Sequence, residues 1–174
     1  MIVPKKYIKP AVLGASDGIV TTFAVVAGVV GAGFATEVII VLGIANMVAD
    51  GISMALGDFL GERSIYRLEK SQGKESDGCC LWKTSLVTFI AFVVAGVLPL
   101  LPYIVMLLGI PVLPDNQFLL SIIATLTAMF FVGSLRTYVI KGSWWKNGIE
   151  MLLVGSVAAT AAYTLGALIE NYIR

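Results

Sequence analysis

Five side chains that can bind a metal ion recur every four residues within one apolar stretch. They are Asn46, Asp50, Met54, Asp58 and Glu62. Four residues turn an α-helix through 400°, so successive members drift by only about 40° and share one side of the helix. Carboxylate oxygens suit Mg²⁺, Ca²⁺ or Mn²⁺, and a thioether sulfur shifts the preference toward a softer ion such as Fe²⁺. The spacing therefore predicts a site or path for a divalent cation.

Carboxylates also occur in two other apolar segments. Asp17 lies within the first one, and Glu150 lies near the start of the last one. A charged side chain at the centre of a bilayer costs about 2.5–3.5 kcal/mol on insertion scales, so it needs a partner, water or a proton. Arg136 can pair with a carboxylate near the end of its span, whereas Asp17 and Asp50 have no basic residue at their depth. Hydration alone would explain Asp58 and Glu150 at an interface, and a protonated, structural Asp50 is the alternative for that position.

The composition is that of a membrane protein. Of 174 residues, 58% are hydrophobic and 13% are charged, and the mean hydropathy is +0.92. In a typical soluble domain about a quarter of the residues are charged. There is no histidine, which removes the usual acid–base catalyst, and the net charge of +1 gives no basic excess for nucleic acid. Cys79 and Cys80 are adjacent, so they predict no disulfide framework; they are either soft metal ligands or bystanders.

Five segments have the roughly 20 apolar residues that a spanning helix needs. They cover about 11–32, 38–60, 84–108, 117–140 and 148–169. The sequence thus predicts an all-α integral membrane protein with a single transmembrane domain over 1–174. The polar loop 61–83 begins with helix-forming residues, so we expect the second span to continue past the membrane and to end by Gly73 or Gly78. Pro111 and Pro114 predict a turn after the third span.

The basic residues predict the orientation of the spans. All except Arg174 lie before the first span, between the second and third, or around the connection between the fourth and fifth. By the positive-inside rule the N-terminus is cytoplasmic and the C-terminus is outside. The basic N-terminal start resembles that of a signal peptide. We expect a retained helix, because the apolar run contains Asp17 and ends without a convincing cleavage site.

Four stretches resemble the vacuolar iron transporter family. They are "SDGIVTTFAVVAG", "ADGISMALGDFLGERS", "FVVAGVLPLLPY" and "LLVGSVAATAAYTLG". The resemblance implies proton-coupled export of Fe²⁺, and often Mn²⁺, from the cytosol into a vacuole or across the cell membrane. It also implies a homodimer of five-helix subunits, with the pathway on the two-fold axis between the first and second spans.

The resemblance assigns roles to individual positions. Asp17 matches the metal-path aspartate of the first span, and Met54 matches the methionine of the second. Asn46 stands where plant-type members have a glutamate, and Asp50, one turn further on, is the candidate for the missing carboxylate. The expected metal ligands are therefore Asp17, Asp50, Met54 and Asp58. Secondary candidates for metal binding are Asn46, Glu62, Glu69 and Glu150. Iron-transporting members often have a Glu- and Met-rich cytoplasmic helical domain after the second span, which is reduced here to a short segment without Met.

The expected function is transport of Fe²⁺ or Mn²⁺ out of the cytosol by proton antiport, with no catalytic residue and no cofactor. The expected partners are the bilayer and a second copy bound through spans one and two. The membrane would be the cell membrane in a prokaryote or a vacuolar-type membrane in a eukaryote. A cation channel without proton coupling and a purely structural membrane protein are alternatives. A phosphatidyltransferase is a further alternative, but the sequence after Asp50–Gly51 lacks the Ala-Arg and the later aspartate pair of that motif.

Overall fold

The computed structural model describes residues 5–74, 81–109, 116–138 and 142–173, and all regular structure in these ranges is helical. The elements are α1 (Lys5–Gly31), α2 (Thr36–Ser71), α3 (Leu81–Leu107), α4 (Gln117–Leu135), the short 3₁₀ helix η3 (Arg136–Tyr138) and α5 (Trp144–Ile173). Five helical segments in the described ranges are long and apolar enough to cross a membrane. The expected all-α class and the five spans are confirmed.

The helices differ in length from the predicted spans. α2 continues through Ser71, as expected for a span that runs on past the bilayer, and Gly73 follows it with a φ of +73°. A positive φ suits glycine because it has no Cβ, and such a residue commonly ends a helix. α4 ends at Leu135 rather than near 140, and η3 follows it. The predicted turn at Pro111 and Pro114 lies outside the described residues.

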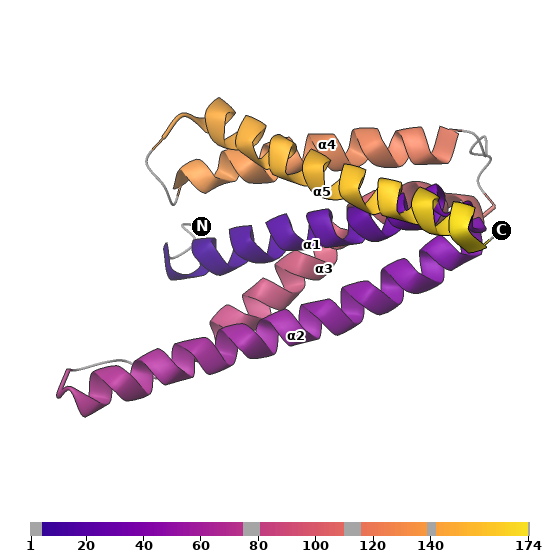
Figure 1. Cartoon of the computed structure of the whole chain (residues 1–174). Helices are drawn as coiled ribbons and strands as arrows, with labels where there is room; N and C mark the ends of the chain where they lie inside the picture. The colour runs from indigo at the N-terminus through magenta and orange to yellow at the C-terminus, as the bar shows by residue number, and fades with distance from the viewer. Residues whose placement is uncertain (1–4, 75–80, 110–115, 139–141, 174) are drawn as a thin grey trace.

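Successive helices run up and down, so the two ends of the chain lie at opposite ends of the bundle (Figure 1). The N-terminal end also holds the end of α2, the start of α3, the end of α4 and the start of α5. The segments that carry the basic residues are therefore gathered at one end, as the predicted orientation requires. α2 extends past the other helices at this end (Figure 1).

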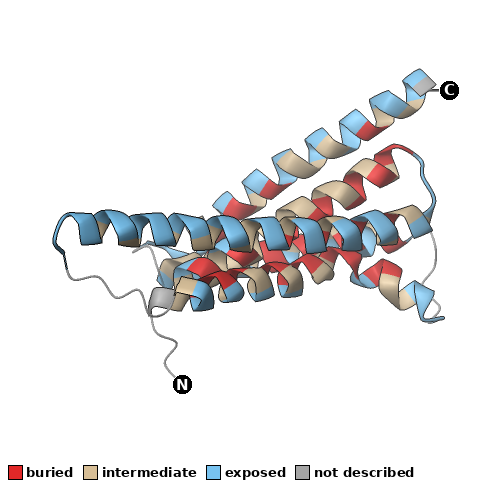
Figure 2. Cartoon of the chain, turned by 90° about the horizontal axis from the view of Figure 1, so that it is seen from below, coloured by how far each residue is buried: buried red, intermediate tan, exposed pale blue. Residues whose placement is uncertain are grey.

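The core lies around α1, which packs against all four other long helices. Its fully buried side chains include Ile19 and Val26 from α1, Phe92 and Leu100 from α3, and Met129 from α4. Figure 2 shows the buried residues concentrated on the inner helices and the exposed ones along the outer side of α2. Many large apolar side chains stay exposed. Such a surface fits lipid, in which helix packing depends on close van der Waals contact rather than on burial from water.

Glycines on α1 allow that close contact on two sides. A Cβ added to Gly14 would lie 3.1 Å from the carbonyl carbon of Thr88 in α3, and one added to Gly31 would lie 3.0 Å from the carbonyl carbon of Tyr163 in α5. In the described structure these small residues of the first span therefore seat α1 against α3 and α5 within one subunit.

Candidate metal pathway

The five candidate positions of α2 form a half-buried stripe. Asn46, Asp50, Met54, Asp58 and Glu62 are all intermediate in exposure, and Glu69 continues the series. On one side of the stripe are the residues of α2 that are buried against the bundle, including Met47 and Gly51. On the other side is an exposed ladder of small residues: Ala45, Ala49, Ser53, Gly57 and Gly61. The side chains that could bind metal thus lie at the boundary between the buried and the exposed side of α2. Another molecule that packs on the exposed side could contact them.

Asp17 of α1 is also half-buried, and its charge interacts with that of Asp50 on α2. These two residues come from different helices and are 33 positions apart in the chain. Two carboxylates whose charges interact repel each other, and in a low-dielectric environment the repulsion is relieved by a cation or a proton. The structure therefore brings together the two carboxylates that the sequence placed deepest in the membrane.

Asp58 is held by a neighbour that the sequence analysis did not identify. The Thr88 hydroxyl in α3 donates to Asp58 Oδ2 at 3.2 Å, and the same hydroxyl lies 3.2 Å from the Thr84 carbonyl oxygen. Thr88 is fully buried. A hydroxyl has one hydrogen, so the carboxylate and the carbonyl compete for it. A threonine in an apolar span indicates that its hydroxyl needs an acceptor. The sequence does not identify Asp58 as that acceptor, because the two residues are 30 positions apart.

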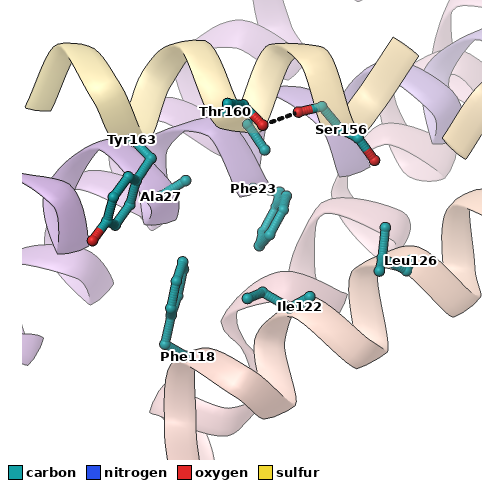
Figure 3. Close-up of a pocket in the computed structure, with 9 residues that line it drawn as sticks. Phe23, Ala27, Phe118, Ile122, Leu126, Ser156, Thr160 and Tyr163 are labelled. Carbon is teal, nitrogen blue, oxygen red and sulfur yellow. Dashed lines mark hydrogen bonds between the residues drawn. The ribbon is translucent and has the colours of Figure 1, made fainter. Parts of the chain in front are cut away.

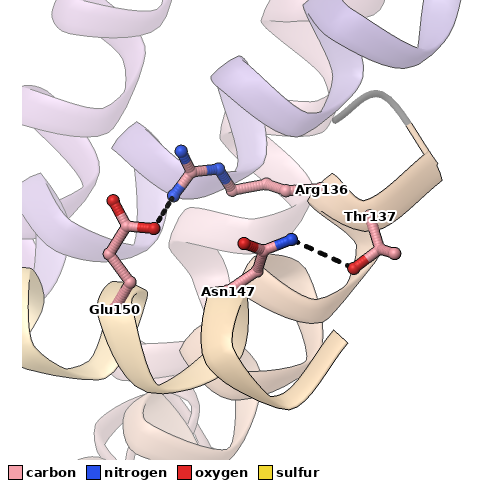
Figure 4. Close-up of polar contacts among 4 residues, drawn as sticks. All are labelled: Arg136, Thr137, Asn147 and Glu150. Atoms are coloured by element: carbon pink, nitrogen blue, oxygen red, sulfur yellow. Dashed lines mark hydrogen bonds and ion pairs between the residues drawn. The ribbon is translucent and has the colours of Figure 1, made fainter. Parts of the chain in front are cut away.

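Glu150 has a different environment from the other candidates. Its Oε2 lies 3.6 Å from an Arg136 guanidinium nitrogen, and Asn147 Nδ2 donates to the Thr137 hydroxyl at 3.1 Å beside it (Figure 4). The expected role of Arg136 as the partner of an interfacial carboxylate is confirmed. The Glu150 side chain is 59% exposed, so this pair joins α5 to η3 at the N-terminal end of the bundle, apart from the α1–α2 carboxylates.

The described part of one chain does not form a complete metal site. No group of three or more Cys, Asp or Glu side chains in those ranges could hold a metal ion together, and Cys79 and Cys80 lie outside the described residues. Met54 is half-buried beside the acidic residues of its stripe. Met47, Met129 and Met151 are buried in the core, as expected of packing residues.

An apolar pocket between α1, α4 and α5 is lined by no charged side chain that could bind a cation. Phe23, Phe118, Ile122 and Tyr163 line it, and the Thr160 hydroxyl at its rim donates to the Ser156 carbonyl oxygen at 2.7 Å (Figure 3). No carboxylate lines the pocket. Charged ligands for an ion are found instead along the α1–α2 seam.

Comparison with known proteins gives a family match over most of the chain. The profile of the VIT family matches residues 8–77 and 72–167. Vacuolar iron transporter homolog 1 of Arabidopsis thaliana is 30% identical over 170 residues, which cover 96% of this chain and 85% of that protein. The vacuolar iron transporter of Toxoplasma gondii is 25% identical over 225 residues, covering 94% and 74% of the two chains. Vacuolar iron transporter 1 of Eucalyptus grandis is 23% identical over 221 residues, covering 94% and 87%.

The alignments also indicate how this chain differs from the longer relatives. An alignment of 225 positions against a chain of 174 residues leaves at least about 50 positions without a counterpart here. The alignment with the Arabidopsis homolog needs only 170 positions. The family match divides at residues 72–77, directly after α2. The chain is thus a short member, and the break falls where the sequence predicted a reduced cytoplasmic segment.

Proposed function

This chain belongs to the VIT family, and on that premise we propose that it exports Fe²⁺ from the cytosol in exchange for protons. Family membership makes it an integral membrane protein that transports metal ions and not an enzyme, which removes the phosphatidyltransferase alternative. The ion, the direction and the coupling are our proposal. The observation that carries it is that α1 and α2 pack against each other and each has a half-buried carboxylate, Asp17 and Asp50, whose charges lie close enough to interact.

The pair suits a dication that exchanges with protons. Without metal, two neighbouring carboxylates in a membrane are most easily accommodated with at least one proton bound. Arrival of a divalent cation favours the charged form of both groups and releases the proton, and departure of the metal lets a proton return. Met54, one turn from Asp50, adds a soft ligand that favours Fe²⁺, while the oxygens alone also accept Mn²⁺.

We further propose that two copies complete the pathway along their α1–α2 seams. In the described ranges of one subunit no three Cys, Asp or Glu side chains come together, and the half-buried stripe adjoins the exposed small-residue ladder of α2. A Cβ added to Gly57 or Gly61 would meet nothing within 4 Å in the described structure. Small residues at four-residue spacing allow close contact between membrane helices. A two-fold axis beside the ladder would duplicate Asp17, Asp50 and Met54.

Cysteine cross-linking tests the dimer. Ala49→Cys, Ser53→Cys and Gly57→Cys should each form a disulfide between subunits in membranes under mild oxidation. Val94→Cys, on an exposed position of α3, is the control and should stay monomeric. If the ladder variants cross-link no better than Val94→Cys while transport is normal, the proposed interface is wrong.

The transport proposal is tested in proteoliposomes with the internal pH monitored. Fe²⁺ flux should be accompanied by proton flux in the opposite direction, and Asp17→Asn should abolish both, because an amide neither attracts a dication strongly nor exchanges a proton. Asp50→Asn should stop both fluxes or separate them. Glu37→Gln, at an exposed carboxylate at the start of α2, is the matched control and should leave both unchanged.

The outcomes also separate the alternatives. Metal flux without proton movement in the unmodified protein would identify a channel. Unchanged metal flux and pH dependence in Asp50→Asn would show that this carboxylate is structural. Wild-type flux in Asp17→Asn would remove Asp17 from the mechanism.

A further inference from the structure

An apolar groove lies between α2 and α3, and no residue of the metal-ligand stripe lines it. It has a volume of about 510 Å³, and its lining includes Ile52, Leu56 and Phe59 from α2 and Trp82, Leu86 and Phe89 from α3. The Leu56 and Trp82 side chains remain more than half exposed. Two residues along a helix correspond to a rotation of 200°, so Met54 points about 160° away from Ile52. An occupant of the groove would therefore leave the α1–α2 seam open.

Basic side chains continue the groove at the end where α2 extends past the bundle. Successive steps of four, three and four residues keep Ile52, Leu56, Phe59 and Arg63 within about 60° of one another, and Arg63 lies about 6 Å further along the axis than Phe59. On α3, Lys83 Nζ lies 5.8 Å from the centre of the Trp82 ring. In the described ranges neither Arg63 nor Lys83 forms an ion pair with a carboxylate.

We propose that this groove binds an anionic phospholipid. An acyl chain lies along the apolar part of the groove, and the phosphate lies between Arg63 and Lys83. Trp82 supports this placement, because tryptophan favours the boundary between the hydrocarbon and the headgroups. The charges of Arg63 and Lys83 favour an anionic occupant. A neutral apolar partner could fill the groove but would leave these two side chains without a counter-charge. Arginine and lysine are also the side chains that bind phosphate best in proteins.

Fluorescence quenching by brominated lipids tests the proposal, because Trp82 itself lines the groove. The chain has three tryptophans, so Trp144→Phe with Trp145→Phe leaves Trp82 alone. Trp82→Phe with Trp144→Phe leaves Trp145, which provides the matched control because Lys146 Nζ lies 5.9 Å from its ring centre. Both variants are reconstituted in bilayers that contain phosphatidylcholine or phosphatidylglycerol with bromine on the acyl chains.

Brominated phosphatidylglycerol should half-quench Trp82 at a mole fraction at least about fivefold lower than brominated phosphatidylcholine does. Lys83→Gln and Arg63→Gln should each lower this preference about fivefold, which corresponds to about 1 kcal/mol for one basic side chain near an anionic surface. Trp145 should be quenched almost equally by the two lipids, and Lys146→Gln should not change its ratio.

Three results would overturn the inference. Equal quenching of Trp82 by both lipids would show that the groove does not distinguish anionic headgroups. The same preference at Trp82 and Trp145 would show a general attraction to the surface. Absence of quenching at Trp82, together with disulfide formation between copies of Leu86→Cys, would show that a second copy covers the groove. Wild-type protein gives an independent readout, because phosphatidylglycerol should raise its unfolding temperature in detergent more than phosphatidylcholine does.

Discussion

Replacement of Gly18 by alanine should separate α1 from α3 and reduce transport. A Cβ at Gly18 would lie 2.9 Å from the carbonyl carbon of Phe92 and 3.0 Å from its Cα. Carbon atoms in good contact are about 3.5–4.0 Å apart, so the two helices must separate by about 0.6 Å or more. The obstacle is backbone, so no change of rotamer can relieve it. Gly18 is adjacent to Asp17 in the chain, and the shift would therefore move that carboxylate relative to Asp50.

Overpacking of this kind costs about 1–3 kcal/mol. For a chain of this size that corresponds to a fall of roughly 2–12 °C in unfolding temperature. Gly28→Ala is the control on the same helix, because its Cβ would lie 3.6 Å from the nearest atom, the Ala162 carbonyl oxygen, which is an ordinary contact. Thermal unfolding in detergent and Fe²⁺ uptake into proteoliposomes should both decrease in Gly18→Ala and change little in Gly28→Ala. Equal behaviour of the two variants would refute the close α1–α3 contact.

Three further substitutions test individual side chains. Thr88→Val removes the hydrogen-bond donor to Asp58. The Fe²⁺ concentration for half-maximal uptake should rise about fivefold, which is equivalent to the roughly 1 kcal/mol of a typical hydrogen bond. An unchanged concentration would show that this hydrogen bond does not position Asp58. Met54→Leu keeps the volume but loses the sulfur, so competition uptake assays should show a larger loss for Fe²⁺ than for Mn²⁺, and equal losses would assign Met54 to packing. Glu150→Gln breaks a solvent-exposed pair with Arg136 and should alter stability by less than about 1 kcal/mol with normal transport, whereas loss of transport would place Glu150 in the pathway.

The fold was predictable from the sequence because its main signals are local. Apolar length predicted the five spans, and the helix-forming residues after Leu60 predicted the continuation of α2 to Ser71. The exact ends were less predictable, since capping and tertiary packing decide them: α1 begins at Lys5 and α4 ends at Leu135. Arg136 was identified as a partner for an interfacial carboxylate because few cations lie near that depth.

Contacts between distant segments were harder to predict. The spacing on α2 indicated one face, but it did not reveal that Thr88 would bind Asp58. Glycines in a membrane span favour close contact between helices, yet a residue without a side chain does not indicate which helix approaches it. Gly14 and Gly18 contact α3, and Gly31 contacts α5. The assignment of metal ligands and the dimer remain predictions for the experiments above.

An odd number of spans, five in the described residues, restricts how such a transporter can alternate between its two sides. The ends of the chain lie at opposite ends of the bundle (Figure 1), and the sequence shows no internal repeat. Transporters built from inverted repeats can form their inward- and outward-open states by exchanging the conformations of two equivalent halves. In a dimer of identically inserted chains the two-fold axis runs along the membrane normal, so it relates the subunits but never the two membrane faces. The inner and outer gates must then be built from different residues, and each can be disabled by mutation without an equivalent effect on the other.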